Sequence, residues 1–314
     1  MPSANIQYSD IRNTAAIIVT YNPDINLLNK CLSRLHGIGK IQIFDNQSSN
    51  LCQIYTLKRL YPALSILESS YNIGLAKAQN LACKSNSTYK FFLFLDQDSV
   101  PSLNYLEDLV TFSQQNNIDF SQNVLTPICI DSSSGLMYPL VFLDQFRGTR
   151  HVREIQPDQE MYFPDILISS GTFISVESFF RSGGFIDSFF IDYIDTEWSL
   201  RLKSIGLLIV ASPKIYLMHR IGDVKIDFFG RSVPVDSPIR KFYRLRNLLL
   251  MTYLPHVPKV LIIVQITKML LVSVVNIFHL KSSLLLELAI LCKALLASAR
   301  LLCKSQDLKP HFES

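Results

Sequence analysis

The chain has 314 residues, of which 48% are hydrophobic, and a formal net charge of +4. This length is enough for one α/β domain with a substantial core and a smaller appendix. The charge is uneven, because residues 238–304 hold ten bases and one acid, Glu287, while the remainder holds twenty bases and twenty-five acids. A basic segment that is also apolar indicates an anionic membrane surface as partner and argues against nucleic acid.

Neither the cysteines nor the N-terminus indicates export. The six cysteines form no C-x-x-C pair, which is typical of thiols in a reducing cytoplasm. The opening segment, MPSANIQYSDIRN, lacks the apolar core of a signal peptide. We therefore expect the catalytic part to stay in the cytoplasm.

The first hundred residues alternate between predicted strands and helices. Apolar runs predict strands at 15–20, 41–44, 64–67 and 91–95. Helical spacing predicts helices at 26–35, at 55–60 and, after a loop, within 71–84. This order is typical of a doubly wound parallel sheet, in which ligands bind beyond the carboxyl ends of the strands. Polar clusters at Tyr21, Asp45 and Asp96 fall at such ends.

The later part of the chain consists of an insertion, a second segment with the pattern of regular secondary structure, and a basic extension. Residues 131–165 predict a loop-rich insertion on the acceptor side. Order returns at 166–175 and in a helix at 195–204, and basic, Leu-rich helices follow Ser232. We predict an α/β domain over 13–231 and an amphipathic helical extension over 232–314.

Asp96-Gln97-Asp98 directly follows the apolar run FFLFL. Two carboxylates one residue apart can share a divalent cation, which takes oxygen ligands and bridges phosphate oxygens. The alternative is a solvated acidic turn, which is less common after a buried strand. His219 follows the run Ile215–Met218 and is a candidate third ligand, although a lone histidine is more often structural.

Two further segments carry candidate functional groups. In Tyr71–Asn80, Gly74 permits close backbone approach, and the amides can bond a nucleotide; a capped helix start with small packing residues explains the segment equally well. In Ile191–Arg201, Asp195 can cap a helix and act as a general base for a sugar hydroxyl. Trp198 either packs on an acceptor sugar or fills the core.

Together these segments resemble the motifs of family 2 glycosyltransferases with the GT-A fold, most of all bacterial rhamnosyltransferases of surface-polysaccharide synthesis. The order and spacing carry the resemblance across about residues 15–222. The matching pieces are IIVTYNP, DNQSS, NIGLAKAQN, FLDQDS, SSGTFIS, GGFIDSFFIDYIDTEWSLR and the region of His219. The implied fold is a GT-A-type doubly wound, mostly parallel sheet, here with a C-terminal amphipathic helical extension.

The resemblance implies a role for each matched residue. On the donor side, Tyr21 stacks on the base, Asp45 bonds its imide N–H, and Asn72 and Asn80 lie along the nucleoside and diphosphate. Asp96, Asp98 and His219 hold the diphosphate through Mg²⁺ or Mn²⁺. On the acceptor side, Asp195 is the base, with Asp192 and Glu197 as alternatives, while Glu197, Trp198 and Arg201 orient the acceptor or the leaving group.

The implied reaction is an inverting transfer of a sugar, rhamnose from dTDP-rhamnose, to a saccharide or lipid-linked acceptor. The implied process is O-antigen or capsule synthesis at the inner face of the bacterial membrane. The sequence departs from the commonest pattern at Gln47 and Leu81, where Gly is usual. Both departures touch the nucleotide pocket and leave the reaction class unchanged.

Two other functions fit parts of the sequence. A haloacid-dehalogenase-type phosphatase would use Asp96 as nucleophile and Asp98 as acid and base, with a second motif at 222–227. Its nucleophile strand normally opens the domain, whereas three predicted strands precede Asp96. A non-catalytic, membrane-bound sugar-binding module would not need the acidic set with His219. A dinucleotide oxidoreductase is excluded because no G-x-G-x-x-G follows the first strand.

The predicted extension has the pattern of a helix that lies on a membrane. Polar residues of 259–281 and bases of the next helix fall along narrow stripes on otherwise apolar helices. These residues are Gln265, Lys268, Asn276 and His279, followed by Lys293, Arg300 and Lys304. We expect peripheral attachment, because Lys268 makes a spanning helix costly. A soluble hairpin packed on the domain or a dimer interface is the alternative.

Overall fold

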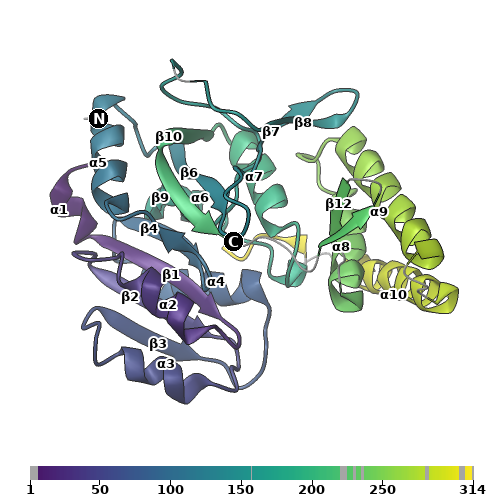
Figure 1. Cartoon of the computed structure of the whole chain (residues 1–314), viewed down its shortest axis with the longest axis horizontal. Coiled ribbons are helices and arrows are strands. Elements are labelled where there is room, and N and C mark those ends of the chain that lie inside the picture. The colour runs from purple at the N-terminus through teal and green to yellow at the C-terminus, as the bar shows by residue number, and fades with distance from the viewer. Residues whose placement is uncertain are drawn as a thin grey trace.

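The structure of the protein is a computed structural model centred on one eight-stranded sheet (Figure 1). It describes residues 6–156, 158–219, 225–228, 231–234, 237–279, 283–303 and 308–312. The strand order is β3-β2-β1-β4-β9-β6-β10-β5. The strands are β1 (Thr14–Thr20), β2 (Lys40–Asp45), β3 (Leu64–Glu68), β4 (Phe91–Asp96), β5 (Val100–Pro101), β6 (Asn123–Asp131), β9 (Phe173–Ser175) and β10 (Leu208–His219).

Helices cover both faces of this sheet. The helices of the sheet domain are α1 (Tyr8–Ile11), α2 (Ile25–Leu32), α3 (Leu51–Leu57), α4 (Leu75–Ser85), α5 (Tyr105–Gln115), α6 (Val176–Arg181), the 3-10 helix η1 (Asp187–Phe189) and α7 (Ile194–Ser204). Side chains alternate along each strand, so Ile18 and Leu95 face the core under α2, α3 and α5, whereas Ile17 and Phe94 face α4, α6 and α7. The predicted doubly wound, mostly parallel sheet is confirmed, with β9 as an antiparallel strand inside it.

The strand register brings the predicted polar clusters to one edge of the sheet. Thr20 is paired with Asp45 on β2, and Val19 is paired with Asp96 on β4. β9 runs antiparallel to both β4 and β6, and β10 runs parallel to β6, so β4 and β10 point the same way. The carboxyl ends of β1, β2, β4 and β10 therefore lie at the same edge.

Some predicted elements differ in the structure. The helix expected at 55–60 is α3, which begins at Leu51 and ends at Leu57, because Ile54 and Leu57 form its buried face. Pro62 disfavours helical backbone at the residue before it, beyond the end of this helix. The insertion predicted as loops contains a hairpin of β7 (Leu140–Asp144) and β8 (Gly148–Val152). A second hairpin, of β11 (Lys225–Phe228) and β12 (Arg231–Pro234), lies across the predicted domain boundary at residue 232.

The extension consists of α8 (Pro238–Met251), α9 (Lys259–His279) and α10 (Leu284–Cys303), gathered at one end of the molecule (Figure 1). Buried Leu250 and Met251 of α8 belong to the same core as α4 and α7. Residues 308–312 return to the sheet domain, where Phe312 stacks edge-on against Phe180 at 4.6 Å. Among the described residues, no helix is long and apolar enough to cross a membrane. The boundary between residues 231 and 232 stays a prediction.

Several predicted positions lie outside the described residues. These are Lys281, Lys304 and residues 222–224 of the phosphatase-like motif, together with the side chains of Asn276 and His279. In the part of α9 that is described, Lys268 is exposed and Gln265 is half-buried, whereas Ile263 and Leu271 are apolar and more than half exposed. The predicted polar stripe is thus accompanied by an exposed apolar face.

Three residues that the resemblance placed at the acceptor lie in the core instead. Trp198 is 0% exposed, and its ring centroid lies 5.9 Å from that of Phe94 and 4.9 Å from that of Phe185. Glu197 and Arg201 are 1% and 5% exposed and form an ion pair at 2.8 Å. This face of α7 packs into the layer of helices, which leaves Glu197 and Arg201 no access to an acceptor and agrees with the alternative that Trp198 fills the core.

The ion pair joins α7 to two other segments. Arg201 also donates to the backbone carbonyls of Ser182 and Gly184, the second at 2.7 Å. His256, which follows α8, lies 2.8 Å from the Glu197 carboxylate. Removing one member of such a network leaves a buried charge without a partner.

We predict that Glu197→Ala lowers the free energy of unfolding by about 3–5 kcal/mol, because Arg201 would stay buried without its carboxylate. Urea denaturation measures the change. Glu160→Ala, at an exposed loop position, is the matched control and should change it by no more than about 0.5 kcal/mol. Equal stability of the two variants would contradict the structural role of the pair.

Candidate metal and catalytic site

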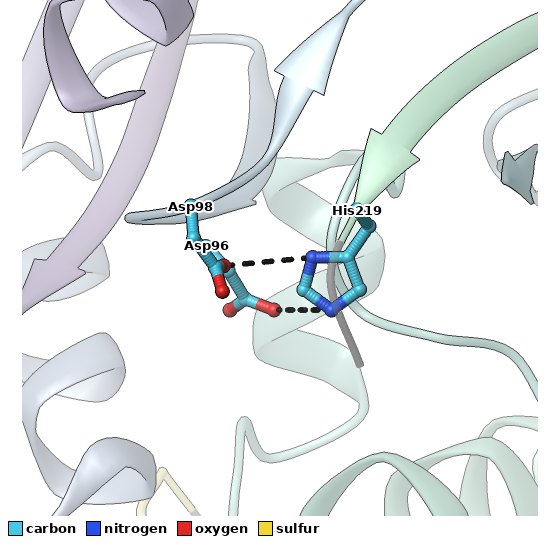
Figure 2. A group of neighbouring side chains, drawn as sticks. All are labelled: Asp96, Asp98 and His219. Carbon is cyan, nitrogen blue, oxygen red and sulfur yellow. Dashed lines mark ion pairs between the residues drawn. The ribbon is translucent and has the colours of Figure 1, made fainter. Parts of the chain in front are cut away.

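Asp96, Asp98 and His219 converge at the carboxyl edge of the sheet (Figure 2). The imidazole faces both carboxylates, with Nε2 3.6 Å from an Asp96 oxygen and Nδ1 3.5 Å from an Asp98 oxygen. One ligand atom from each residue falls within 4.8 Å of the others. Ligands of one small cation, each at about 2.1 Å from it, are spaced about 3–4 Å apart, so the three groups fit a divalent ion.

Strand pairing and two serines hold the three groups together. β5 begins two residues after Asp98 and pairs antiparallel with β10, which places Val100 opposite Met218, the neighbour of His219. Ser99 Oγ lies 2.8 Å from His219 Nδ1 and 2.7 Å from Ser170 Oγ. Ser170 Oγ in turn accepts the backbone N–H of Asp96 at 2.9 Å. This chain leaves Nε2 of His219 as the nitrogen available to a cation.

The charges of the cluster are suited to a cation. Burial, reinforced by the nearby charge of Asp98, raises the pKa of Asp96 to about 7. Burial lowers the pKa of His219, so its imidazole is neutral at pH 7 and keeps a lone pair for a ligand bond. Two carboxylates that repel each other are stabilised when a divalent cation lies between them. The site therefore fits a hard cation with oxygen and nitrogen ligands.

Asp195 lies in the first turn of α7, beside the metal cluster. It does not cap the helix as the sequence predicted, since Tyr193 is at the N-cap position. Its carboxylate instead accepts the backbone N–H of Ser169 at 3.2 Å. Burial and then the charge of Asp96 raise its pKa to about 6. A half-buried carboxylate with a raised pKa is suited to accept a proton near neutral pH.

The two alternative bases are engaged elsewhere. Asp192 accepts two bonds from the guanidinium of Arg240, at 2.6 and 3.2 Å. Glu197 is held by Arg201 inside the core, and this contact lowers its pKa against the effect of burial. Asp195 is therefore the carboxylate of this segment that is free of an arginine partner.

The loop before Asp195 is strained and is held by α8. Phe190, Asp192 and Tyr193 have φ values of 58°, 64° and 60°, in the left-handed region that non-glycine residues rarely adopt. The amide nitrogen of Asn247 lies 2.8–2.9 Å from the carbonyl oxygens of Phe189, Ile191 and Asp192. Because this amide is buried in α8, the extension fixes the backbone of the loop that leads to Asp195.

The motif at Tyr71–Asn80 supports the same loop from the other side. A Cβ at Gly74 would lie 2.6 Å from the Phe190 ring, so only glycine allows this approach. Asn80 is 0% exposed and exchanges hydrogen bonds with both backbone groups of Phe185, besides donating to Asp187. The predicted contact of Asn80 with the donor is wrong, because both ends of its amide are used inside the protein.

The remaining donor-side residues line the neighbouring strand ends. Tyr21 is 50% exposed, and its backbone is bonded to Gln97 of the acidic motif at 2.7 Å. Asp45 is 1% exposed and accepts from Thr20 and Ser48, so a nucleobase could reach it only after the loop at Ser48 moves. The oxygen of Asn72 accepts from the Gly74 backbone at 3.0 Å. Tyr21 is therefore the most accessible of the predicted donor contacts.

The departures from the family pattern have a structural explanation. Gln47 adopts a φ of 70°, the conformation in which glycine is favoured, which accounts for the usual glycine there. Leu81 is half-buried and packs against the core shared by α4 and α7. The first departure bears on the loop beside Asp45, while the second faces the interior.

Sequence reasoning missed Ser99, Ser169, Ser170 and Asn247. Ser99 is next to the acidic motif, and the two serines belong to the SSGTFIS segment, so their position near a candidate site was the available signal. Asn247 gives no such signal, because its role depends on carbonyl groups of a loop more than fifty residues away.

A curated relative matches most of the chain. It is the dTDP-rhamnosyl transferase RfbF of Shigella flexneri, 31% identical over 263 residues, which are 81% of this chain and 84% of the relative. No protein-family profile matches the sequence.

Solved structures share the fold at low sequence identity. The GalNAc-T7 structure with UDP, GalNAc and Mn²⁺ has a TM-score of 0.54 at 14% identity, and it covers 76% of this chain and 47% of its own. S. aureus TarS has a TM-score of 0.52 at 15% identity, covering 76% of this chain and 39% of its own. Residues 1–349 of TarS with UDP give 0.52 at 17% identity, covering 86% and 75%. This chain thus spans less than half of the first two.

The structural neighbours and the curated relative support the family resemblance that the order of the motifs indicates. The neighbours share the mostly parallel α/β sheet of the GT-A fold. The relative is 31% identical over most of both chains. The chain therefore belongs to the family of dTDP-rhamnosyl transferase RfbF, and is a glycosyltransferase of the GT-A fold.

Proposed function

We propose that the protein transfers rhamnose from dTDP-rhamnose, with inversion at the anomeric carbon, to a saccharide or lipid-linked acceptor in bacterial surface-polysaccharide synthesis. The observation that carries the proposal is the Asp96–Asp98–His219 cluster beside Asp195, with Ser169 and Ser170 joining the two. The donor is proposed from the printed activity of the relative. The phosphatase alternative has no support from this relative.

The proposed roles follow from the positions of the side chains. Asp96, Asp98 and His219 would hold Mg²⁺ or Mn²⁺ with the donor diphosphate, and Tyr21 would stack on the base. A bound cation would supply neutralising charge for the leaving nucleoside diphosphate. Asp195 removes the acceptor proton as that oxygen attacks C1 from the face opposite the leaving group. A single displacement inverts the centre, so dTDP-β-L-rhamnose gives an α linkage.

We predict that Asp98→Asn abolishes transfer and cation-dependent binding of dTDP, because an amide keeps the shape of the side chain and loses its charge. Excess chelator should do the same to the wild type. Calorimetric titration of dTDP with Mn²⁺ and an activity assay measure both effects. Asp158→Asn, on an exposed loop, is the matched control and should behave as the wild type. Full activity in excess chelator would refute the metal-dependent mechanism.

We predict that Asp195→Asn lowers kcat by roughly 10²–10⁴-fold, the usual contribution of general-base catalysis, with little change in dTDP affinity. In the wild type, kcat should fall as pH drops through the pKa of Asp195, about 6 without a cation, because the protonated acid cannot accept the acceptor proton. Binding of a cation would lower this pKa from that raised value. A variant as active as the wild type would remove Asp195 from the mechanism.

We also propose that the extension attaches the enzyme peripherally to an anionic membrane at its cytoplasmic face. Support comes from the excess of bases in residues 238–304 and from exposed apolar side chains on α9 and α10. Leu271 and Leu285 are 60% and 78% exposed. An amphipathic helix in the interface places such side chains in the acyl layer and its bases at the headgroups.

We predict that the wild type sediments with phosphatidylglycerol vesicles and is released by high salt. The double variant Leu271→Glu, Leu285→Glu should stay in the supernatant, whereas Leu103→Glu, at an exposed position outside the extension, should sediment normally. Point substitutions suit this test better than truncation, because residues 308–312 pack on the sheet domain. A wild type that remains in the supernatant would refute attachment.

A further inference from the structure

A cavity of about 350 Å³ lies within the extension, between α8, α9 and α10. This volume is in the range of about 300–1,000 Å³ found for small-ligand pockets. Ten of its seventeen lining residues are aliphatic or Met: Leu245, Met269, Leu270, Val272, Val274, Ile277, Leu284, Leu288, Ile290 and Leu291. The pocket therefore suits a hydrocarbon ligand.

The pocket opens onto the exposed apolar face of the extension. Leu270, Val274, Leu284 and Leu288 line it and are also 46–56% exposed to solvent. Contiguous apolar surface of this kind marks an interaction site more often than a free surface. A chain that enters from a lipid layer could pass into the pocket without crossing polar surface.

The polar lining of the pocket is positively charged. Lys241, Arg244 and Lys268 line it together with one acid, Glu287, which pairs with Lys241 at 2.6 Å. Lys268 is exposed and has no ion-pair partner among the described side chains. An apolar cavity lined by a lysine without an acidic partner in the described part of the chain, beside two paired cations, matches an amphiphile that carries an anionic group, such as a lipid phosphate.

The charged side of the pocket adjoins the segment that carries the base. Tyr193 lines the pocket and is also the N-cap residue of α7, two positions before Asp195. Arg244, another lining residue, lies 3.7 Å from the carboxylate of Asp192. A ligand whose anionic group lies at Arg244 would have its polar end beside the loop that precedes Asp195.

We propose that this pocket binds the phosphate and the first hydrocarbon units of a lipid-phosphate-linked acceptor, so that the saccharide beyond the phosphate extends toward Asp195. The proposal rests on the glycosyltransferase function proposed above and identifies its acceptor as lipid-linked. The occupant is the acceptor itself and not bulk phospholipid, because the pocket wall includes Tyr193, the N-cap residue of α7, two positions before Asp195.

Calorimetric titration of the full-length protein with dodecyl phosphate, below its micelle concentration, tests the proposal. Ser273→Phe fills the pocket from α9 and should weaken binding at least about tenfold. Thr267→Phe adds the same ring to the same helix at an exposed position outside the pocket, and should leave binding unchanged. Lys268→Met, at an exposed site, should weaken binding about three- to tenfold. Dodecanol and inorganic phosphate should each bind more weakly than the amphiphile.

Binding of dodecyl phosphate that is equal in the wild type and in Ser273→Phe, or no binding at all, would overturn the proposal. Loss of vesicle sedimentation together with dodecyl phosphate binding in Ser273→Phe would assign the pocket to bulk phospholipid and would also overturn it. A parallel titration with dTDP and Mn²⁺ separates a failure of the proposed function from a failure of the pocket proposal. Its failure in the wild type counts against the proposed function, whereas normal dTDP binding without dodecyl phosphate binding refutes the pocket alone.

Discussion

The antiparallel pairing of β5 with β10 is the interaction on which the site depends. It joins only two residue pairs, yet it fixes the segment that follows Asp98 against the strand that ends in His219. β10 is also paired with β6 along most of its length, so the imidazole is positioned by the sheet and not by a mobile loop. The three side chains therefore come together as the sheet forms, and the hydrogen bonds of Ser99 to Ser170 and to His219 fix the orientation of the imidazole.

The base depends on a different set of contacts, which reaches into the C-terminal extension. The strained backbone between Phe190 and Tyr193 would relax without partners for its carbonyl groups. Asn247 of α8 supplies them, while Gly74 of α4 lets the loop pack closely from the opposite side. The extension therefore holds the backbone that positions Asp195. Tyr193 belongs to this backbone and also lines the pocket of the extension.

The sequence predicted the sheet well, because buried strands and their polar ends are local patterns. It also singled out Asp96, Asp98, His219 and Asp195, which the structure brings together at one edge of the sheet, since the order of motifs is specific even where each motif is weak. It placed Asn80, Glu197 and Arg201 at a ligand although they are buried, and it left Trp198 undecided, because the side of a helix that is covered depends on elements far away in the sequence. For α7 these elements include His256, whose contact with Glu197 no local pattern encodes. The clamp by Asn247 was unpredictable for the same reason.

The central claim is that Asp96, Asp98 and His219 form one cation site that holds the donor diphosphate. Anomalous diffraction at the manganese edge, from crystals grown with Mn²⁺ and dTDP, tests it most directly. The account predicts one strong peak at about 2.0–2.3 Å from a carboxylate oxygen of each aspartate and from His219 Nε2, with the diphosphate oxygens completing the shell. Bound dTDP with no manganese peak at these three side chains, or with the peak elsewhere, would contradict the claim.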